Sequence, residues 1–133
     1  NFSMWGGPQD AFLRRFESWK GPCHYFYEQD YEAYLQYHQQ PLGFYFYDGD
    51  HQYEHQLKGL KLAEPYMAPG CVVMVDDTNW QEPRQATYDF MESCEADYRV
   101  LLDQQTASDR VAQQESAMHP TFWNGLMLIQ KTS

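Results

Sequence analysis

The chain has 133 residues, of which 43% are apolar and 17% aromatic, so it can bury a core and is not expected to be disordered. Nine Lys and Arg against nineteen Asp and Glu give a net charge of −10, which disfavours nucleic acids and anionic membranes as partners. Three cysteines without paired spacing predict free thiols, and no apolar run is long enough for a membrane span, so we expect one cytoplasmic domain over 1–133.

Helical and extended segments alternate along the first half of the chain. Aromatic residues at helical spacing predict a helix over 8–19, and Asp30 can cap a second helix over 30–37. Between them, the aromatic segment 23–27 is typical of a short strand. The continuously apolar run 43–47 predicts a central strand covered on both faces, so helices are expected to flank the sheet.

The alternation continues in the middle of the chain. An apolar stripe predicts a helix over 53–67, which Ala68-Pro69-Gly70 ends, and the run 72–75 predicts a second buried strand. Pro83 is suited to the first turn of another helix, which we expect to reach 96. Strand, helix and strand in this order indicate parallel pairing.

Two further strands are expected at the end of the chain, over 99–102 and 122–129. Because no long apolar helix separates them, they predict an antiparallel hairpin at one edge of an otherwise parallel sheet. Asn124-Gly125 would then mark a bulge in the last strand. The fold class is therefore α/β, with a Rossmann-like, mostly parallel sheet flanked by helices.

Acidic residues follow both apolar strands of the predicted parallel pair. Asp48 comes directly after the first strand, and Asp76 and Asp77 end the second. Open parallel sheets bind ligands at this edge, and three carboxylates there would suit Mg²⁺, Mn²⁺ or Ca²⁺. The alternative is that Asp48 or Asp50 caps the next helix and Asp77 caps the next turn, with no metal.

His51 is a candidate general base in the turn that follows Asp48. Its ordinary pKa lies near neutrality, and a nearby cation would ease removal of a proton from a substrate hydroxyl. Asp50 is the competing base. A lone histidine in a polar turn can equally be a solvated cap or a hydrogen-bond partner.

The segment Phe44–Arg84 resembles the fourth and fifth strands of a class I S-adenosylmethionine-dependent methyltransferase. The resemblance lies in the Asp-Gly-Asp-His-x-Tyr turn, the Pro-Gly before a strand and the Val-Asp-Asp-Thr-Asn-Trp ending. It is strongest to small-molecule O-methyltransferases of the macrocin and cephalosporin-pathway type, and weaker to caffeoyl-CoA and catechol enzymes. It implies Mg²⁺ on Asp48, Asp76 and Asp77, His51 or Asp50 as the base, and S-adenosylmethionine contacts from Gln29, Asp30 and Asp48.

The resemblance leaves out the first two strands of that family. The chain has no G-x-G-x-G turn for the methionine end of the cofactor and no acid for its ribose, so we expect it to be incomplete at its amino end. On its own it would then bind S-adenosylmethionine poorly. Loss of neighbouring strands would also expose the edge of 43–47, which a homo-oligomer could cover.

The leading hypothesis is metal-assisted methyl transfer to the hydroxyl of a small molecule. A metal-dependent phosphoesterase is an alternative because an acid-rich edge can hold two metals, although only His55 and His119 follow it. A third possibility is a non-catalytic remnant of the same fold, in which aromatic residues bind carbohydrate or a partner and the acids only cap helices.

Overall fold

The computed structural model describes residues 9–106 and 124–133. The chain divides into two compact units, Asn1–Asp30 and Tyr31–Ser133, which are described separately below. The single domain expected over 1–133 stays a prediction.

The first unit contains the helix α1 (Gln9–Trp19), as the aromatic spacing predicted. Phe26 packs against α1, with its ring centroid 5.2 Å from that of Phe12. Pro8, the expected first helical residue, lies outside the described residues. The expected strand over 23–27 is wrong, because this segment pairs with no other strand among the described residues and a strand is defined by such pairing.

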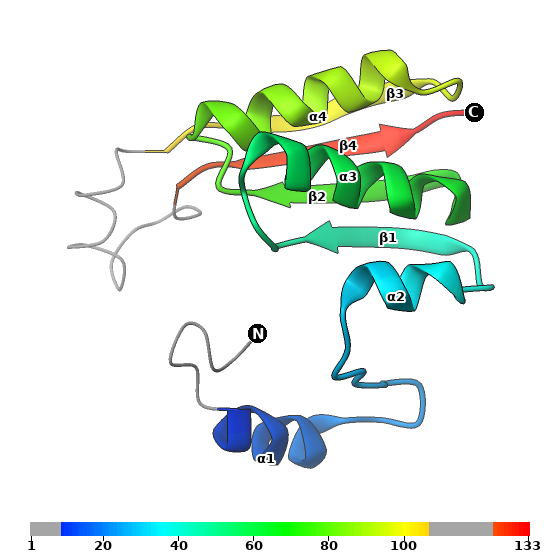
Figure 1. Cartoon of the computed structure of the whole chain (residues 1–133), viewed down its shortest axis with the longest axis vertical. Helices are drawn as coiled ribbons and strands as arrows, with labels where there is room; N and C mark the ends of the chain where they lie inside the picture. The colour runs from blue at the N-terminus through cyan, green and yellow to red at the C-terminus, as the bar shows by residue number, and fades with distance from the viewer. Residues whose placement is uncertain (1–8, 107–123) are drawn as a thin grey trace. The chain divides into compact units, whose positions relative to one another are not determined.

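The second unit is a four-stranded sheet with helices packed on it (Figure 1). Its strands lie in the order β1-β2-β4-β3, with β1 and β2 parallel and the other two pairs antiparallel. The predicted α/β class with an antiparallel pair at one edge is therefore confirmed. The elements are α2 (Tyr31–Gln36), β1 (Leu42–Tyr47), α3 (Tyr53–Ala63), the 3-10 helix η1 (Glu64–Tyr66), β2 (Met67–Asp76), α4 (Gln81–Ser93), β3 (Tyr98–Gln104) and β4 (Leu126–Lys131).

The position of β1 differs from the sequence expectation. In the described sheet β1 is an outer strand, and Phe44 and Phe46 are 55% and 43% exposed. The prediction of a central strand covered on both faces is therefore wrong for the described residues. The physical reason is that α3 and α4 lie together on one face of the sheet, as Figure 1 shows, so the alternate side chains of β1 have no helix to pack against.

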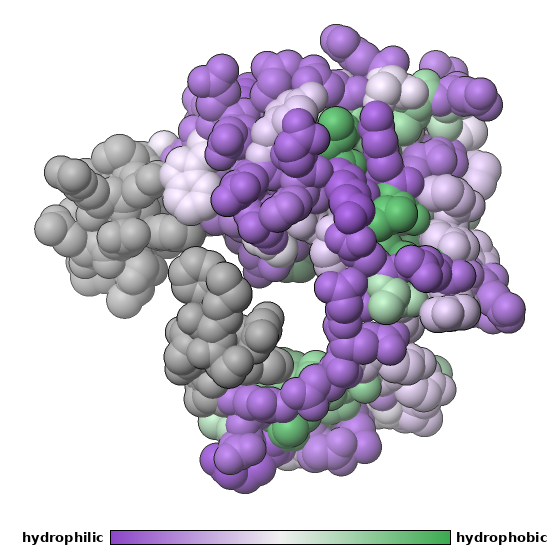
Figure 2. Space-filling model, viewed as in Figure 1, coloured by the Kyte–Doolittle hydropathy of each residue, from purple (hydrophilic) through white to green (hydrophobic). Residues whose placement is uncertain are grey.

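Apolar residues of the covered face form the core. Alternate residues of β2 point towards the helices, and Leu60 and Ala63 of α3 meet them one turn apart. Figure 2 shows that the surface over α3 and α4 is largely hydrophilic, as expected for amphipathic helices. The buried core residues are Leu35, Leu60, Ala63, Met67, Cys71, Val73, Val75, Phe90, Met127 and Ile129.

The cysteines and the helices bear on the expected free thiols and on the expected absence of a membrane span. Cys23, Cys71 and Cys94 are all free thiols, as their spacing predicted. Among the described residues, no helix has both the length and the apolar character that a membrane span requires. A cytoplasmic location stays a prediction.

The boundaries of β2 and β4 also differ from expectation. Ala68-Pro69-Gly70 lies inside β2 rather than ending a helix, and the pairing with β1 shifts register there. The helix predicted over 53–67 is α3, and it ends earlier, at Ala63, because Pro65 falls in the following η1 turn. Asn124-Gly125 precedes β4 instead of forming a bulge within it, and both residues have positive φ, 60° and 86°.

The last residue of β1, Tyr47, is buried under the turn that follows it. Its hydroxyl lies within hydrogen-bond distance of the carbonyls of Asp50, at 3.2 Å, and His55, at 3.3 Å. The ring fits only because two neighbours are glycines: a Cβ at Gly49 would lie 2.8 Å from the ring, and one at Gly59 would lie 2.2 Å from it. The ring therefore fixes both the turn and the start of α3.

Substitution of Gly59 by alanine tests this packing. We expect Gly59→Ala to lower the free energy of unfolding by about 1–3 kcal/mol, because the new methyl group overlaps the buried Tyr47 ring. This loss would outweigh the gain in helix propensity from alanine, about 1 kcal/mol. Urea denaturation measures the change. Gly43→Ala is the control, since nothing lies within 4 Å of its Cβ position, and equal stability of the two variants would contradict the prediction.

Candidate active site at the carboxyl edge of the sheet

The parallel pairing of β1 and β2 brings two acidic turns to one edge of the sheet. Tyr47 is opposite Val75 in the ladder. Asp48 and Asp76, which directly follow these two residues, therefore lie at the same edge of the sheet. This edge is where ligands bind in open α/β sheets. We use the term acid rim for Asp48, His51, Asp76 and Asp77.

His51 lies between two carboxylates of the acid rim. Its Nε2 is 3.2 Å from Oδ2 of Asp77 and 3.7 Å from Oδ1 of Asp48. The Asp77 side chain is only 9% exposed, whereas that of Asp48 is 59% exposed, so Asp77 is the closer and the more desolvated partner. The ring of Trp80 meets the imidazole edge to face at 5.8 Å between centroids. These contacts fix the plane of the His51 ring.

The two nitrogens of His51 have different surroundings. Nε2 faces the carboxylates, whereas Nδ1 is buried and has no hydrogen-bond partner within the described residues. A carboxylate only accepts hydrogen bonds, so the contact with Asp77 favours the tautomer with the proton on Nε2. The lone pair of the neutral ring then lies on Nδ1.

Asp77 is held in an unusual backbone conformation by its neighbours. Its φ of 57° is in the left-handed region, and the Trp80 N–H donates to its carbonyl at 3.0 Å, which closes the turn after β2. The amide Nδ2 of Asn124 donates to Oδ1 of Asp77 at 2.9 Å. Both carboxylate oxygens of Asp77 therefore have partners, His51 on one and Asn124 on the other.

Asn124 is a site residue that the sequence did not reveal as one. Its Asn-Gly pair predicted only a backbone irregularity, because both residues tolerate positive φ. Its contact with Asp77 joins residues 47 positions apart. The available signal was a polar residue preceding a strand that pairs with β2, which places it at the same edge as Asp77.

Asp76 is an acid of the rim whose pKa is shifted by its surroundings. Burial raises the pKa of its carboxyl, and the negative charges of Asp77 and Asp48 raise the pKa further. The charged form is therefore disfavoured in the folded state relative to the unfolded chain.

Asp50, the competing base, is engaged in local contacts. Its Oδ1 accepts a hydrogen bond from the Gln52 N–H at 3.0 Å, and its Oδ2 lies 2.8 Å from Nδ1 of His55. The backbone donor, followed by the His55 contact, lowers the pKa of Asp50. This carboxylate thus shapes the turn before α3 but does not cap the helix, because the N-cap residue is Gln52 and no side chain caps it, so the capping alternative is wrong for Asp50.

Gln29 and Asp30, the other residues that the resemblance assigns to the cofactor, are the last two residues of the first unit. Both are exposed, and Asp30 immediately precedes α2, where a helix start was expected. Their role in cofactor binding stays a prediction.

The acid rim as it is arranged does not fit a magnesium ion. No group of three His, Cys, Asp or Glu side chains among the described residues could hold a metal ion. The geometry explains this result, because Asn124 and His51 occupy the oxygens of Asp77 that a cation would need. The assignment of Mg²⁺ to Asp48, Asp76 and Asp77 has no support in this arrangement and stays a prediction.

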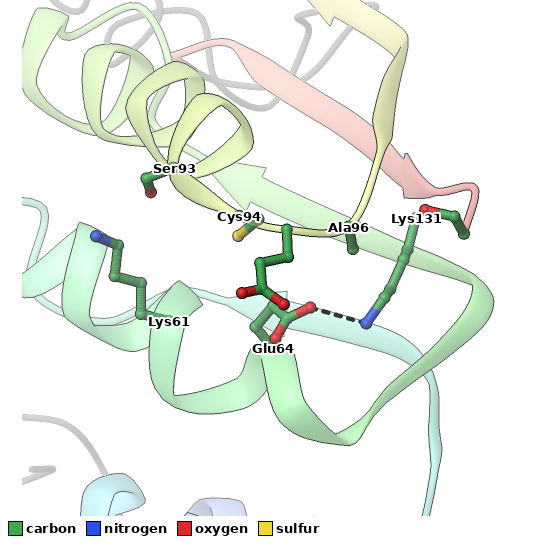
Figure 3. A pocket seen from close by; sticks show the side chains of 8 residues that line it. Lys61, Glu64, Ser93, Cys94, Ala96 and Lys131 are labelled. Carbon is green, nitrogen blue, oxygen red and sulfur yellow. Dashed lines mark hydrogen bonds and ion pairs between the residues drawn. The ribbon is translucent and has the colours of Figure 1, made fainter.

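A cavity of about 630 Å³ lies at the opposite edge of the sheet, where α3 and α4 end (Figure 3). Lys131 donates to Glu64 across it at 2.8 Å. Because the strand pair β1–β2 delivers its acids to the other edge, this cavity is separate from the acid rim. It is lined by Lys61, Glu64, Ser93, Cys94, Glu95, Ala96, Lys131 and Ser133.

Comparison with known proteins identifies one family. A family model described as a methyltransferase domain matches residues 8–78, which is more than half of the 133 residues. The matched segment includes β1, β2 and all four residues of the acid rim. No curated protein and no solved structure matches the chain.

The buried charge of Asp76 makes a testable difference to stability. We expect Asp76→Asn to raise the free energy of unfolding at pH 7 by about 1 kcal/mol or less, because a neutral amide avoids the cost of a half-buried charge. Since the folded-state pKa is raised, stability falls as pH rises through it, and the gain should vanish in acid, where the carboxyl is protonated in both states.

Urea denaturation at neutral and acidic pH measures this effect. Glu92→Gln, an exposed change on α4, is the control and should alter stability little at either pH. A lower stability of Asp76→Asn at pH 7 would show that the charged carboxylate stabilises the fold.

Proposed function

The chain belongs to the methyltransferase-domain family that matches residues 8–78, and from that premise we propose that it methylates a hydroxyl group of a small molecule, with S-adenosylmethionine as the methyl donor. One observation carries the choice of a hydroxyl. His51 lies at the ligand-binding edge of the sheet, held by Asp77 through Nε2, so its other nitrogen is suited to accept a proton.

Two residues of the acid rim have different roles in proton removal: Asp77 orients the imidazole, and His51 accepts the proton. Asp77 orients the imidazole and favours the proton on Nε2, so the lone pair of Nδ1 is the basic site. Because Nδ1 is buried in this structure, the side chains that cover it must move apart before a substrate hydroxyl can contact it. The hydroxyl then loses its proton to this nitrogen as its oxygen forms the new bond to the methyl carbon. Bound S-adenosylmethionine supplies that carbon on a positively charged sulfur, which leaves as a neutral thioether. The protonated ring is then stabilised by the negative charge of Asp77.

The surroundings of Asp50 and Asp48 support different roles for these acids. Asp50 is engaged by Gln52 and His55 in its own turn, which favours His51 as the base. Asp48 is the most exposed acid of the rim, so its carboxylate can accept hydrogen bonds from a ligand. We assign Asp48 to the cofactor.

A homo-oligomer is part of the proposal. In the described sheet β1 is an outer strand without a charged side chain, and Phe44 and Phe46 are exposed on it. Outer strands of this kind tend to pair with another chain.

The net charge of −10 also favours small-molecule ligands over nucleic acids.

Substitution of His51 tests the proposed base. We expect His51→Gln to lower kcat for methyl transfer by about 10²- to 10⁴-fold, because glutamine cannot accept the proton at neutral pH. The assay measures release of S-adenosylhomocysteine with catechol, phenol and methyl glucoside as acceptors. His55→Gln is the matched control, since His55 is 54% exposed and contacts Asp50 instead of Asp77. An unchanged rate in His51→Gln would refute the assignment.

Magnesium assistance is a separate hypothesis that a chelator tests. Because both oxygens of Asp77 already have protein partners, we expect EDTA to leave the rate of methyl transfer nearly unchanged. The same assay is run with EDTA and after addition of excess Mg²⁺. Loss of the reaction in EDTA with recovery in Mg²⁺ would instead support a metal on Asp48, Asp76 and Asp77, with the His51 contact opened.

A further inference from the structure

Asn124 is a buried amide in contact with the residues of the proposed chemistry. It is fully buried, and its Nδ2 donates to Oδ1 of Asp77 at 2.9 Å. The other oxygen of the same carboxylate faces Nε2 of His51 at 3.2 Å. The three side chains therefore form a chain of contacts from a buried amide, through a carboxylate, to the imidazole.

The backbone holds Asn124 in place independently of its side chain. The N–H of Asn79, in the turn after β2, donates to the Asn124 carbonyl at 2.9 Å. The next residue, Gly125, lies so close that a Cβ there would be 2.7 Å from the Asn79 nitrogen. Asn124 has a φ of 60°, which asparagine tolerates better than most residues. The amide thus approaches Asp77 from a fixed position.

The hydrogen bond from Asn124 decides how Asp77 can meet His51. A carboxylate that is 9% exposed needs partners for both oxygens, since an unmade hydrogen bond to a buried charge is costly. With Oδ1 held by the amide, the carboxylate cannot rotate freely, and Oδ2 is left for the imidazole. We propose that Asn124 is a positioning residue that sets the orientation and tautomer of His51 through Asp77. This inference rests on the proposed function of His51.

Two variants test the side-chain amide of Asn124 separately from the backbone conformation of this residue. Asn124→Gly removes the donor but keeps a residue that adopts positive φ readily. Asn124→Asp keeps the size of the side chain but places a carboxylate oxygen opposite Asp77. Thr87→Val is the matched control, because Thr87 is also fully buried and its hydroxyl donates at 2.7 Å to the Pro83 carbonyl within α4. Circular dichroism verifies that each variant folds.

We expect a split between the kinetic constants. In both Asn124 variants kcat with catechol, or with phenol or methyl glucoside if the wild type prefers one of them, should fall about tenfold to a hundredfold. The KM for S-adenosylmethionine should stay within about twofold, because the amide does not touch the cofactor in this proposal. Thr87→Val should change neither constant. A kcat loss no larger than that of Thr87→Val would overturn the inference.

The second readout needs no turnover. Side-chain ¹⁵N NMR spectra of His51 at constant pH report which nitrogen carries the proton, and we expect Nε2–H in the wild type and a mixture in both variants. Unchanged spectra would overturn the positioning role even if kcat falls. If the wild type methylates none of the three acceptors, the proposed function fails for this chain by itself, and the spectra alone decide the role of Asn124. If Asn124→Gly does not fold, Asn124→Asp decides; if neither folds, the role is structural and the inference is wrong.

Discussion

The parallel hydrogen-bonded ladder between β1 and β2 is the constraint on which the proposed chemistry depends. Two strands that run in the same direction end at the same edge, so the turn carrying His51 and the turn carrying Asp77 meet although the two residues are 26 positions apart in the sequence, with a helix between them. The apolar packing of α3 and α4 on β2 holds the ladder in register. A slip by one residue would exchange the two faces of a strand and part these side chains.

Burial of the Asp77 carboxylate is the second determinant of the site. A charge taken out of water must be compensated by nearby donors, and here the compensation comes from an imidazole on one side and an amide on the other. These contacts connect three segments: the turn after β1, the turn after β2 and the residues before β4. The proposed methyl-transfer chemistry and the cohesion of this edge therefore rely on the same few polar contacts.

Much of this arrangement could be predicted from the sequence, because it depends on local patterns. The apolar runs and the helical stripe between them predicted β1, α3 and β2, and hence the acids at their ends. The predictions that were wrong concern features that depend on segments far away in the sequence. The segment 23–27 has strand-like residues but no neighbouring strand among the described residues, and β1 has an apolar pattern without a helix on its second face. Asn124 was missed because a contact across 47 residues leaves no periodic signal.

The tight fit of Tyr47 between Gly49 and Gly59 has a consequence for how such a protein can diverge. One aromatic ring supports the turn that carries His51 and also sets the distance between β1 and α3. A larger residue at either glycine would have to be matched by a smaller ring at position 47. These three positions should therefore covary among homologues, and a substitution at one of them would affect both the stability of the fold and the position of His51.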